Sequence, residues 1–162
     1  GAKGDNVVQA IDVIAGKTSV GGAVVVVGGR YLGMETALLL AEQGRKVSLV
    51  TERELGRNGR FVERHMRLAL RDRLIERGVF VYPFSPLHQV TGDGVYVVNN
   101  RELMFLKADT VVLAVGAVAQ DKLQQEIKEA FPQLELHAIG DCVEPRDAME
   151  AIREGAEVGR LI

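Results

Sequence analysis

The sequence predicts an α/β fold in which helices flank a parallel β-sheet that carries a small antiparallel β-meander as an insertion. Residues 23–27 and 110–116 are unbroken apolar runs rich in valine, which is typical of parallel strands buried on both faces. Residues 34–43 and 62–77 carry helix-forming patterns between strands. Residues 87–106 instead hold short apolar runs separated by turn residues, which indicates the meander. Strands alternating with helices, then a meander and a further strand, predict this fold class.

The first expected element is a short helix over residues 5–15. Its apolar residues recur on one face, Asn6 is placed to cap its start and Gly16 to end it. The α/β elements expected next are strand 23–27, helix 34–43, strand 46–50, helix 62–77 and a third buried strand at 79–82. In the second of these helices, apolar residues recur every four positions from Val62 to Leu74, and its arginines lie off that stripe. We therefore expect the arginines to form a solvated, salt-bridged face.

The second half of the chain is expected to begin with the meander and to end in a different pattern. The expected elements are strands 87–90, 94–98, 103–106 and 110–116, helix 121–130, strand 134–139 and a last helix. Asp147 precedes that helix, and Glu150 follows three residues later, which is the pattern of a capping box.

Composition limits the classes of function that the chain can serve. The chain has 162 residues, 26% of them charged, and a formal net charge of -2, which argues against a nucleic-acid binder or a membrane-surface protein. No apolar run approaches the roughly 20 residues that a membrane-spanning helix needs. The single cysteine, Cys142, and a first segment without a signal-peptide layout lead us to expect a cytoplasmic protein.

Residues that could carry chemistry of their own are few. His65, His88 and His137 have no cysteine or carboxylate at metal-ligand spacing, so we expect no metal site. Cys142 lacks a C-x-x-C partner, and no pattern joins a nucleophile to a base. We therefore predict no catalytic side chain, and we expect any chemistry to be that of a bound cofactor.

The turn at residues 28–33 is the principal candidate for a binding site. A dinucleotide carries a charged pyrophosphate, which the N–H groups and positive dipole end of a helix N-terminus attract. The fingerprint of a Rossmann-like dinucleotide-binding fold has glycine at the first, third and sixth positions of the strand-to-helix turn. Gly28 and Gly33 hold the first and sixth positions, whereas Arg30 replaces the middle glycine.

Arg30 leaves two interpretations open. Its side chain can obstruct the approach of the pyrophosphate to the backbone, or its guanidinium can swing out and pair with the phosphates. The two outer glycines can also serve only the packing of strand against helix. Because a strand precedes the turn and a helix follows it, we favour binding by Gly28, Gly29, Arg30, Tyr31, Leu32 and Gly33.

The end of the second strand should contact the ribose of the dinucleotide. An acidic residue there, such as Glu52, would hold the 2′-hydroxyl of NAD. However, we expect Thr51 at the strand-end position, and Arg53, Arg57 and Arg60 follow, which suits the 2′-phosphate of NADP. These arginines can equally belong to a solvated loop, and the sequence leaves NAD and NADP open.

Three motifs resemble one family. The runs at residues 24–37 (VVVVGGRYLGMETA), 108–117 (ADTVVLAVGA) and 137–146 (HAIGDCVEPR) are similar to the NAD(P)-binding module of two-dinucleotide flavoproteins. They resemble most the C-terminal half of the NADH:flavin oxidoreductases, such as 2,4-dienoyl-CoA reductase and trimethylamine dehydrogenase. That half of these enzymes is similar to the pyridine nucleotide-disulfide oxidoreductases. The motifs stand in the family's order and span nearly the whole chain.

The resemblance implies that the module binds NAD(P)H and passes electrons to flavin within a longer enzyme. It implies a seam to an FAD-type domain at residues 1–20, an NAD(P)-binding Rossmann-like domain at 21–120 and the end of the FAD-type domain at 121–162. The rest of that FAD-type domain, and a barrel that carries FMN and an iron–sulfur cluster, would be further parts of the enzyme. We expect the isolated chain to be inactive.

The resemblance also implies roles for individual residues. Glu35 matches a glutamate near the nicotinamide, the Val115–Gly116 turn lies near the coenzyme, and Asp141 of the late Gly-Asp motif binds the flavin side in the full-length protein. From the sequence alone, Glu35 is simply an acid in the first turn of its helix. The sequence departs from the family at Arg30, at Thr51 and at Ala119, where proline is frequent.

These departures keep a second hypothesis open, in which the module is degenerate and has a structural or ADP-holding role without hydride transfer. A stand-alone Rossmann-like domain for a ligand such as an S-adenosyl compound is a third. The resemblance beyond the first turn counts against it.

Overall fold

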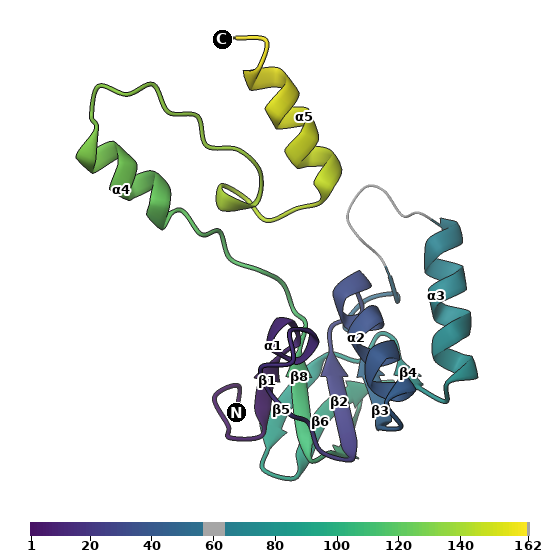
Figure 1. Cartoon of the computed structure of the whole chain (residues 1–162). Coiled ribbons are helices and arrows are strands. Elements are labelled where there is room, and N and C mark those ends of the chain that lie inside the picture. Colours follow the sequence, from purple (N-terminus) through teal and green to yellow (C-terminus); the bar gives the residue numbers. More distant parts are fainter. Residues whose placement is uncertain (57–63, 162) are drawn as a thin grey trace. The chain divides into compact units, whose positions relative to one another are not determined.

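The computed structural model describes residues 1–56 and 64–161. The chain divides into two compact units, Gly1–Val115 and Gly116–Ile162, and each is described by itself. Figure 1 labels most of the helices and strands.

The first unit is built on a five-stranded parallel sheet with the strand order β1-β8-β2-β3-β4 (Figure 1). These strands are β1 (Val7–Gln9), β2 (Ala23–Val27), β3 (Lys46–Val50), β4 (Phe80–Tyr82) and β8 (Thr110–Leu113). The central strand β2 pairs with β3 on one side and with β8 on the other, so that Val26 lies between Leu49 and Val112. The parallel sheet confirms the predicted α/β class.

Three helices cover one face of this sheet. They are α1 (Ala10–Ile14), α2 (Tyr31–Glu42) and α3 (Arg64–Glu76). Alternate residues of β2, Val24 and Val26, pack with Met34 and Leu40 of α2 and with Leu74 of α3 in one buried cluster. Successive side chains of a strand point to opposite faces, so the other residues of β2 must be buried elsewhere.

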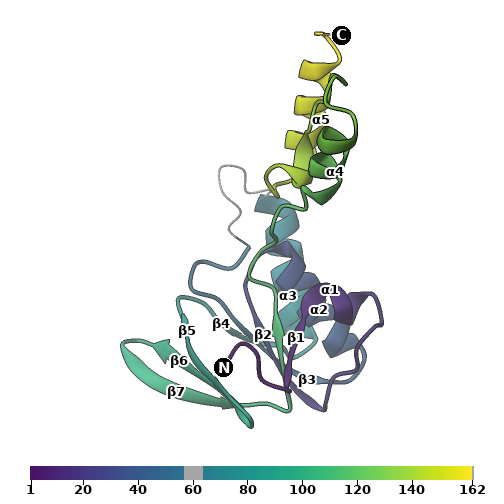
Figure 2. The same ribbon diagram turned by 90° about the vertical axis from the view of Figure 1, so that its left-hand side faces the viewer.

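A three-stranded antiparallel sheet covers the opposite face (Figure 2). Its strands are β5 (Leu87–Thr91), β6 (Gly94–Asn99) and β7 (Glu102–Lys107), which confirms the predicted meander. Val25 and Val27 of β2 pack there against Val95 and Val97. The turn between β6 and β7 holds Asn100 and Arg101 at φ 50 and 69, as a two-residue hairpin turn requires.

The prediction of a helix over residues 5–15 was wrong in its first half. Val7–Gln9 form β1, which pairs with β8 in a register that places Val7 beside Val111. Asn6 does not cap α1, because its side-chain amide donates to the carbonyl of Thr91 instead. A distant strand therefore decided the local conformation.

Other expected boundaries shift by a few residues. Helix α2 begins at Tyr31, three residues before the predicted start, and α3 is described only from Arg64, so that Val62 lies outside the described residues. Strand β4 is not fully buried as expected, because it lies at the edge of the sheet and leaves Phe80 53% exposed.

The second unit contains α4 (Lys122–Ala130), the 3₁₀ turn η1 (Gly140–Cys142) and α5 (Ala148–Val158). The side chain of Asp147 accepts a hydrogen bond from the N–H of Glu150, as the capping pattern predicted. The predicted strand at 134–139 is wrong: no strand forms within residues 116–161, and an extended segment needs a partner strand for its ladder. In the described part of the chain, every helix is too short or too polar to cross a membrane.

Candidate functional site

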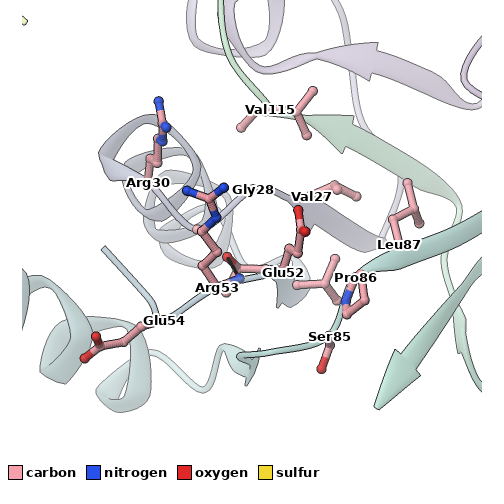
Figure 3. Close-up of a pocket in the computed structure, with 14 residues that line it drawn as sticks. Val27, Gly28, Arg30, Glu52, Arg53, Glu54, Ser85, Pro86, Leu87 and Val115 are labelled. Atoms are coloured by element: carbon pink, nitrogen blue, oxygen red, sulfur yellow. Dashed lines mark hydrogen bonds between the residues drawn. The ribbon is translucent and has the colours of Figure 1, made fainter. Parts of the chain in front are cut away.

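A hollow of about 380 Å³ lies in the first unit, where β2, β3 and β8 end. In open α/β sheets, ligands bind outside the carboxyl ends of the strands, and ligand pockets span roughly 300–1,000 Å³. Figure 3 shows Arg30 and Arg53 at one side of the hollow and Leu87 and Val115 at the other. The lining residues are Val27, Gly28, Gly29, Arg30, Val50, Thr51, Glu52, Arg53, Glu54, Ser85, Pro86, Leu87, Ala114 and Val115.

The glycine turn forms one wall of the hollow, and its shape requires two glycines. Gly28 has a φ of 118, and a Cβ there would overlap the carbonyl oxygen of Ala114. A Cβ on Gly33 would overlap the carbonyl oxygen of Gly28. The N–H of Gly28 donates to the carbonyl of Val50 at 2.9 Å, which ties the turn to β3. The outer glycines of the fingerprint therefore let the turn fold tightly between two strands and a helix.

The segment at residues 51–56 lies directly against this turn. Thr51 is only 7% exposed, and its Cβ lies 2.6 Å from the position that a Cβ on Gly29 would take. The N–H of Gly56 donates to the carbonyl of Gly29 at 2.6 Å. The carbonyl of Thr51 accepts from the N–H of Ser85 at 2.8 Å. These contacts hold three segments of the chain together around the hollow.

Arg30 stands at the N-cap of α2 with extended backbone, φ -79 and ψ 177. Its side chain makes no capping hydrogen bond and is exposed. The first N–H groups of an α-helix have no partner within the helix, so the uncapped end is electropositive. The backbone of Gly28 and Gly29, next to a helix end without a side-chain cap, fits a pyrophosphate.

Three charged residues follow β3 and line the hollow: Glu52, Arg53 and Glu54. All three are exposed. The Oε1 atom of Glu54 lies 2.5 Å from Nη1 of Arg67, whose side chain is 19% exposed. The charge of Glu54 is thus neutralised by Arg67 of α3. Glu52 and Arg53, in contrast, form no ion pair with any residue in the described ranges.

The sequence also matches a known protein family. The model for pyridine nucleotide-disulphide oxidoreductases matches residues 5–155. The chain belongs to the pyridine nucleotide-disulphide oxidoreductase family. This membership confirms the coarser part of the sequence interpretation, namely an oxidoreductase domain of the flavoprotein type.

Several known proteins are similar to nearly the whole chain. A metal reductase of Desulforamulus reducens is 33% identical over 179 residues, covering 94% of this chain and 26% of that protein. A cinnamate reductase of Clostridium sporogenes is 32% identical, covering 98% of this chain and 24% of that protein. The structure of 2-naphthoyl-CoA reductase in complex with 2-naphthoyl-CoA superimposes with a TM-score of 0.86 at 27% identity, over 100% of this chain and 24% of that one. The chain therefore spans about a quarter of the length of these relatives.

Some of the predicted site residues of this oxidoreductase domain meet at the hollow. They are Gly28, Gly29, Arg30, Thr51, Glu52, Arg53 and Val115. Sequence reasoning missed Val27, Val50, Glu54, Ser85, Pro86, Leu87 and Ala114. One signal could have found the segment 85–87, because it follows β4, and ligands of such sheets gather at the carboxyl ends of strands.

The other predicted site residues do not line the hollow. They are Tyr31, Leu32, Gly33, Glu35, Gly116 and Asp141. Gly116 and Asp141 belong to the second unit, where Oδ1 of Asp141 accepts from the N–H of Arg146 at 3.1 Å. Arg57 and Arg60 lie outside the described residues.

Glu35 lies away from the glycine turn. It lines a groove between α2 and α3 together with Leu38 and Leu70. The expectation that it is a first-turn acid was wrong, because α2 begins at Tyr31 and has no acidic residue in its first turn. The early start of the helix explains the difference.

The predicted absence of metal ligands stays a prediction. Within residues 1–56 and 64–161, no three side chains of the metal-binding types come together. The thiol of Cys142 donates to the carbonyl of Ile139 at 3.0 Å.

Proposed function

We propose that the chain is the NAD(P)H-binding part of a longer flavin-dependent oxidoreductase similar to the NADH:flavin oxidoreductases and 2,4-dienoyl-CoA reductase. In that enzyme, electrons pass from NAD(P)H to flavin. The observation that carries the proposal is the hollow, which brings Gly28–Arg30 and Glu52–Arg53 together at the carboxyl ends of parallel strands.

The residues around the hollow suit the parts of the coenzyme. Gly28 and Gly29 present backbone without side chains to the pyrophosphate, and the uncapped N-terminus of α2 favours its charge. Glu52 and Arg53 stand where the adenosine ribose is read. The bound coenzyme supplies the hydride, and the protein binds and orients it.

Two features support a place in a longer enzyme. The chain spans about a quarter of the length of its relatives. In the second unit, several apolar side chains are more than half exposed, among them Leu123, Phe131, Met149 and Ile152. Such side chains fit a segment that packs against a further domain. We propose that residues 1–20 and 121–162 adjoin an FAD-type domain, with Asp141 on its flavin side.

The remaining parts of the proposed enzyme follow from the family resemblance. They are the rest of the FAD-type domain and a barrel that carries FMN and an iron–sulfur cluster. The isolated chain would bind coenzyme without turnover, and we place the enzyme in the cytoplasm.

Isothermal titration of the purified chain with NADH and with NADPH tests the proposal. We expect saturable heat for at least one of them. The control ligand is nicotinamide mononucleotide, which lacks the pyrophosphate-linked adenosine that the hollow would hold. The absence of heat for both coenzymes at millimolar concentration would rule out the proposed function.

A second candidate function rests on Arg30, which lines the hollow where the fingerprint has glycine. In that case the domain is degenerate, with a structural or ADP-holding role. The variant Arg30→Gly separates the two candidates. If the variant binds NAD(P)H and the wild type does not, obstruction by Arg30 is the cause and the degenerate role is correct.

A further inference from the structure

We infer that the hollow selects NADPH over NADH, with the guanidinium of Arg53 binding the 2′-phosphate of the adenosine ribose. The inference deepens the proposed function and rests on it. The two coenzymes differ only in that phosphate, so the charges beside the ribose decide between them.

The residue directly after β3 cannot hold a ribose hydroxyl in the manner typical of NAD sites. That position is Thr51, which carries no charge and is 7% exposed. Its side chain is turned toward Gly29, and its Oγ1 accepts from the N–H of Arg53 at 3.4 Å. Thr51 therefore shapes the wall of the hollow and leaves recognition of the ribose to the two residues after it.

The charges at this end of the hollow favour an anion. Glu54 is paired with Arg67 at 2.5 Å, so these two charges cancel. Arg30, Glu52 and Arg53 are exposed and, within the described ranges, have no ion-pair partner. Two cations against one carboxylate leave a net positive charge, which attracts a phosphate dianion and gives a neutral hydroxyl no comparable advantage.

The backbone of Arg53 is also held in place beside the hollow. Its N–H contacts Thr51, and its carbonyl accepts from the N–H of Phe84 at 3.5 Å. Figure 3 shows its guanidinium on the same side of the hollow as that of Arg30. A guanidinium offers phosphate a planar, paired set of donors, which lysine or glutamine does not.

Adenosine 2′,5′-bisphosphate and adenosine 5′-monophosphate provide the first test, since they isolate the 2′-phosphate from the nicotinamide end. We expect the bisphosphate to bind at least about tenfold more tightly, as a charge-assisted contact implies. NADPH and NADH should differ in the same direction and by a similar factor. Added salt should shrink the difference, because the pair is exposed.

The variant Arg53→Gln should remove most of that preference by weakening the binding of NADPH about tenfold more than that of NADH. Arg45→Gln is the matched control: it removes the same charge from an exposed position at the opposite end of β3 and should leave the preference unchanged. Circular dichroism should give the same spectrum for all three proteins.

The outcomes are distinct for the two proposals. NADH binding as tightly as NADPH, or a preference that survives Arg53→Gln, overturns the inference and leaves the proposed function standing. Tighter NADH binding that Glu52→Gln weakens assigns the ribose to Glu52 instead and also overturns it. If neither coenzyme binds, the proposed function fails and the inference fails with it.

Discussion

At the scale of single residues, the glycine turn excludes side chains for two different reasons. Gly28 combines a left-handed backbone, φ 118, with direct contact to the Ala114 carbonyl. Gly33 lies in helical backbone, and only its contact with the Gly28 carbonyl excludes a Cβ. A substitution at Gly33 therefore reports the energetic effect of the close contact between helix and turn. It does not force an L-residue into left-handed backbone, as a substitution at Gly28 would.

Gly33→Ala should destabilise the protein. Alanine gains about 1 kcal/mol of helix propensity over glycine, whereas forcing an atom into packed surroundings costs roughly 1–3 kcal/mol. The overlapping atom is a backbone oxygen, which no rotamer change can move, so the cost falls in the upper part of that range, about 2–3 kcal/mol. We therefore expect a net loss of about 1–2 kcal/mol in the free energy of unfolding. Urea denaturation of the wild type and the variant measures this difference.

Gly22→Ala is the control for that experiment, since the nearest atom to a new Cβ would be the Asp109 Oδ2 atom at 3.7 Å, an ordinary contact. It should change the free energy of unfolding by less than about 0.5 kcal/mol. Equal effects of the two substitutions would contradict the close approach at Gly33.

The roles of Gly28 and Gly33 in the turn were predictable from the sequence, because their spacing matches the positions at which a tight strand-to-helix turn leaves no room for a side chain. It could not predict that Thr51 is buried, since that depends on Gly29 lying opposite. Nor could it predict Phe84, an exposed residue at φ 51, where no glycine or asparagine marks the left-handed backbone. Contacts between distant segments decide both positions.

At the scale of elements, η1 and α5 are joined by one carboxylate. The N–H of Gly140 donates to Oε2 of Glu154 at 2.7 Å, and the Arg146 guanidinium donates to Oε1 of the same residue. The hydrogen bond from Gly140, and then that from Arg146, lower the pKa of Glu154 below its usual value of 4.5. The ionised carboxylate therefore holds the turn that contains Asp141 against the helix.

Acidification should release this turn. Because the pKa of Glu154 is lower in the folded than in the unfolded state, its contribution is fully present above pH 4.5 and is lost as the pH falls through the folded pKa. NMR titration of the Gly140 amide should report this loss. In Glu154→Gln, whose amide oxygen can still accept from Gly140, the amide shift should no longer follow the same titration. An identical titration in that variant would contradict the role of Glu154.

Among the elements, strand 23–27 and the capped helix after Asp147 were predictable because their signals are local. Strand β1 and residues 134–139 were not, because a strand exists only with a partner. For Val7 the partner strand lies about a hundred residues away, and residues 134–139 have none within 116–161. The periodicity of apolar residues along a segment does not show which other strand, if any, that segment pairs with.

At the scale of the whole molecule, burial is distributed unevenly between the two units. Both clusters of buried apolar side chains draw only on residues up to Ala114. Among the described residues from 116 onward, no apolar side chain is fully buried. The burial of apolar side chains, which stabilises a fold, is therefore concentrated in the first unit.

Hydrogen–deuterium exchange should reveal this difference. We expect amides in β2, β3 and β8 to be protected and those of α4 and α5 to exchange on the order of a hundredfold faster or more. Mass spectrometry of peptides from the exchanged chain measures both units at once. Protection of α5 equal to that of β2 would show that the second unit has a stable core of its own.

The sheet order has a consequence for the way the chain acquires its fold. Strand β1 pairs with β8 and not with β2, although β2 is the next strand along the chain. During synthesis, β1 and one edge of β2 therefore stay open until residues 110–113 leave the ribosome. Strand β1 is made long before its partner β8, and closure over so long a loop is slow. The strands of the meander pair with their neighbours along the chain, so the meander can form before β8 is made. It can then cover one face of β2.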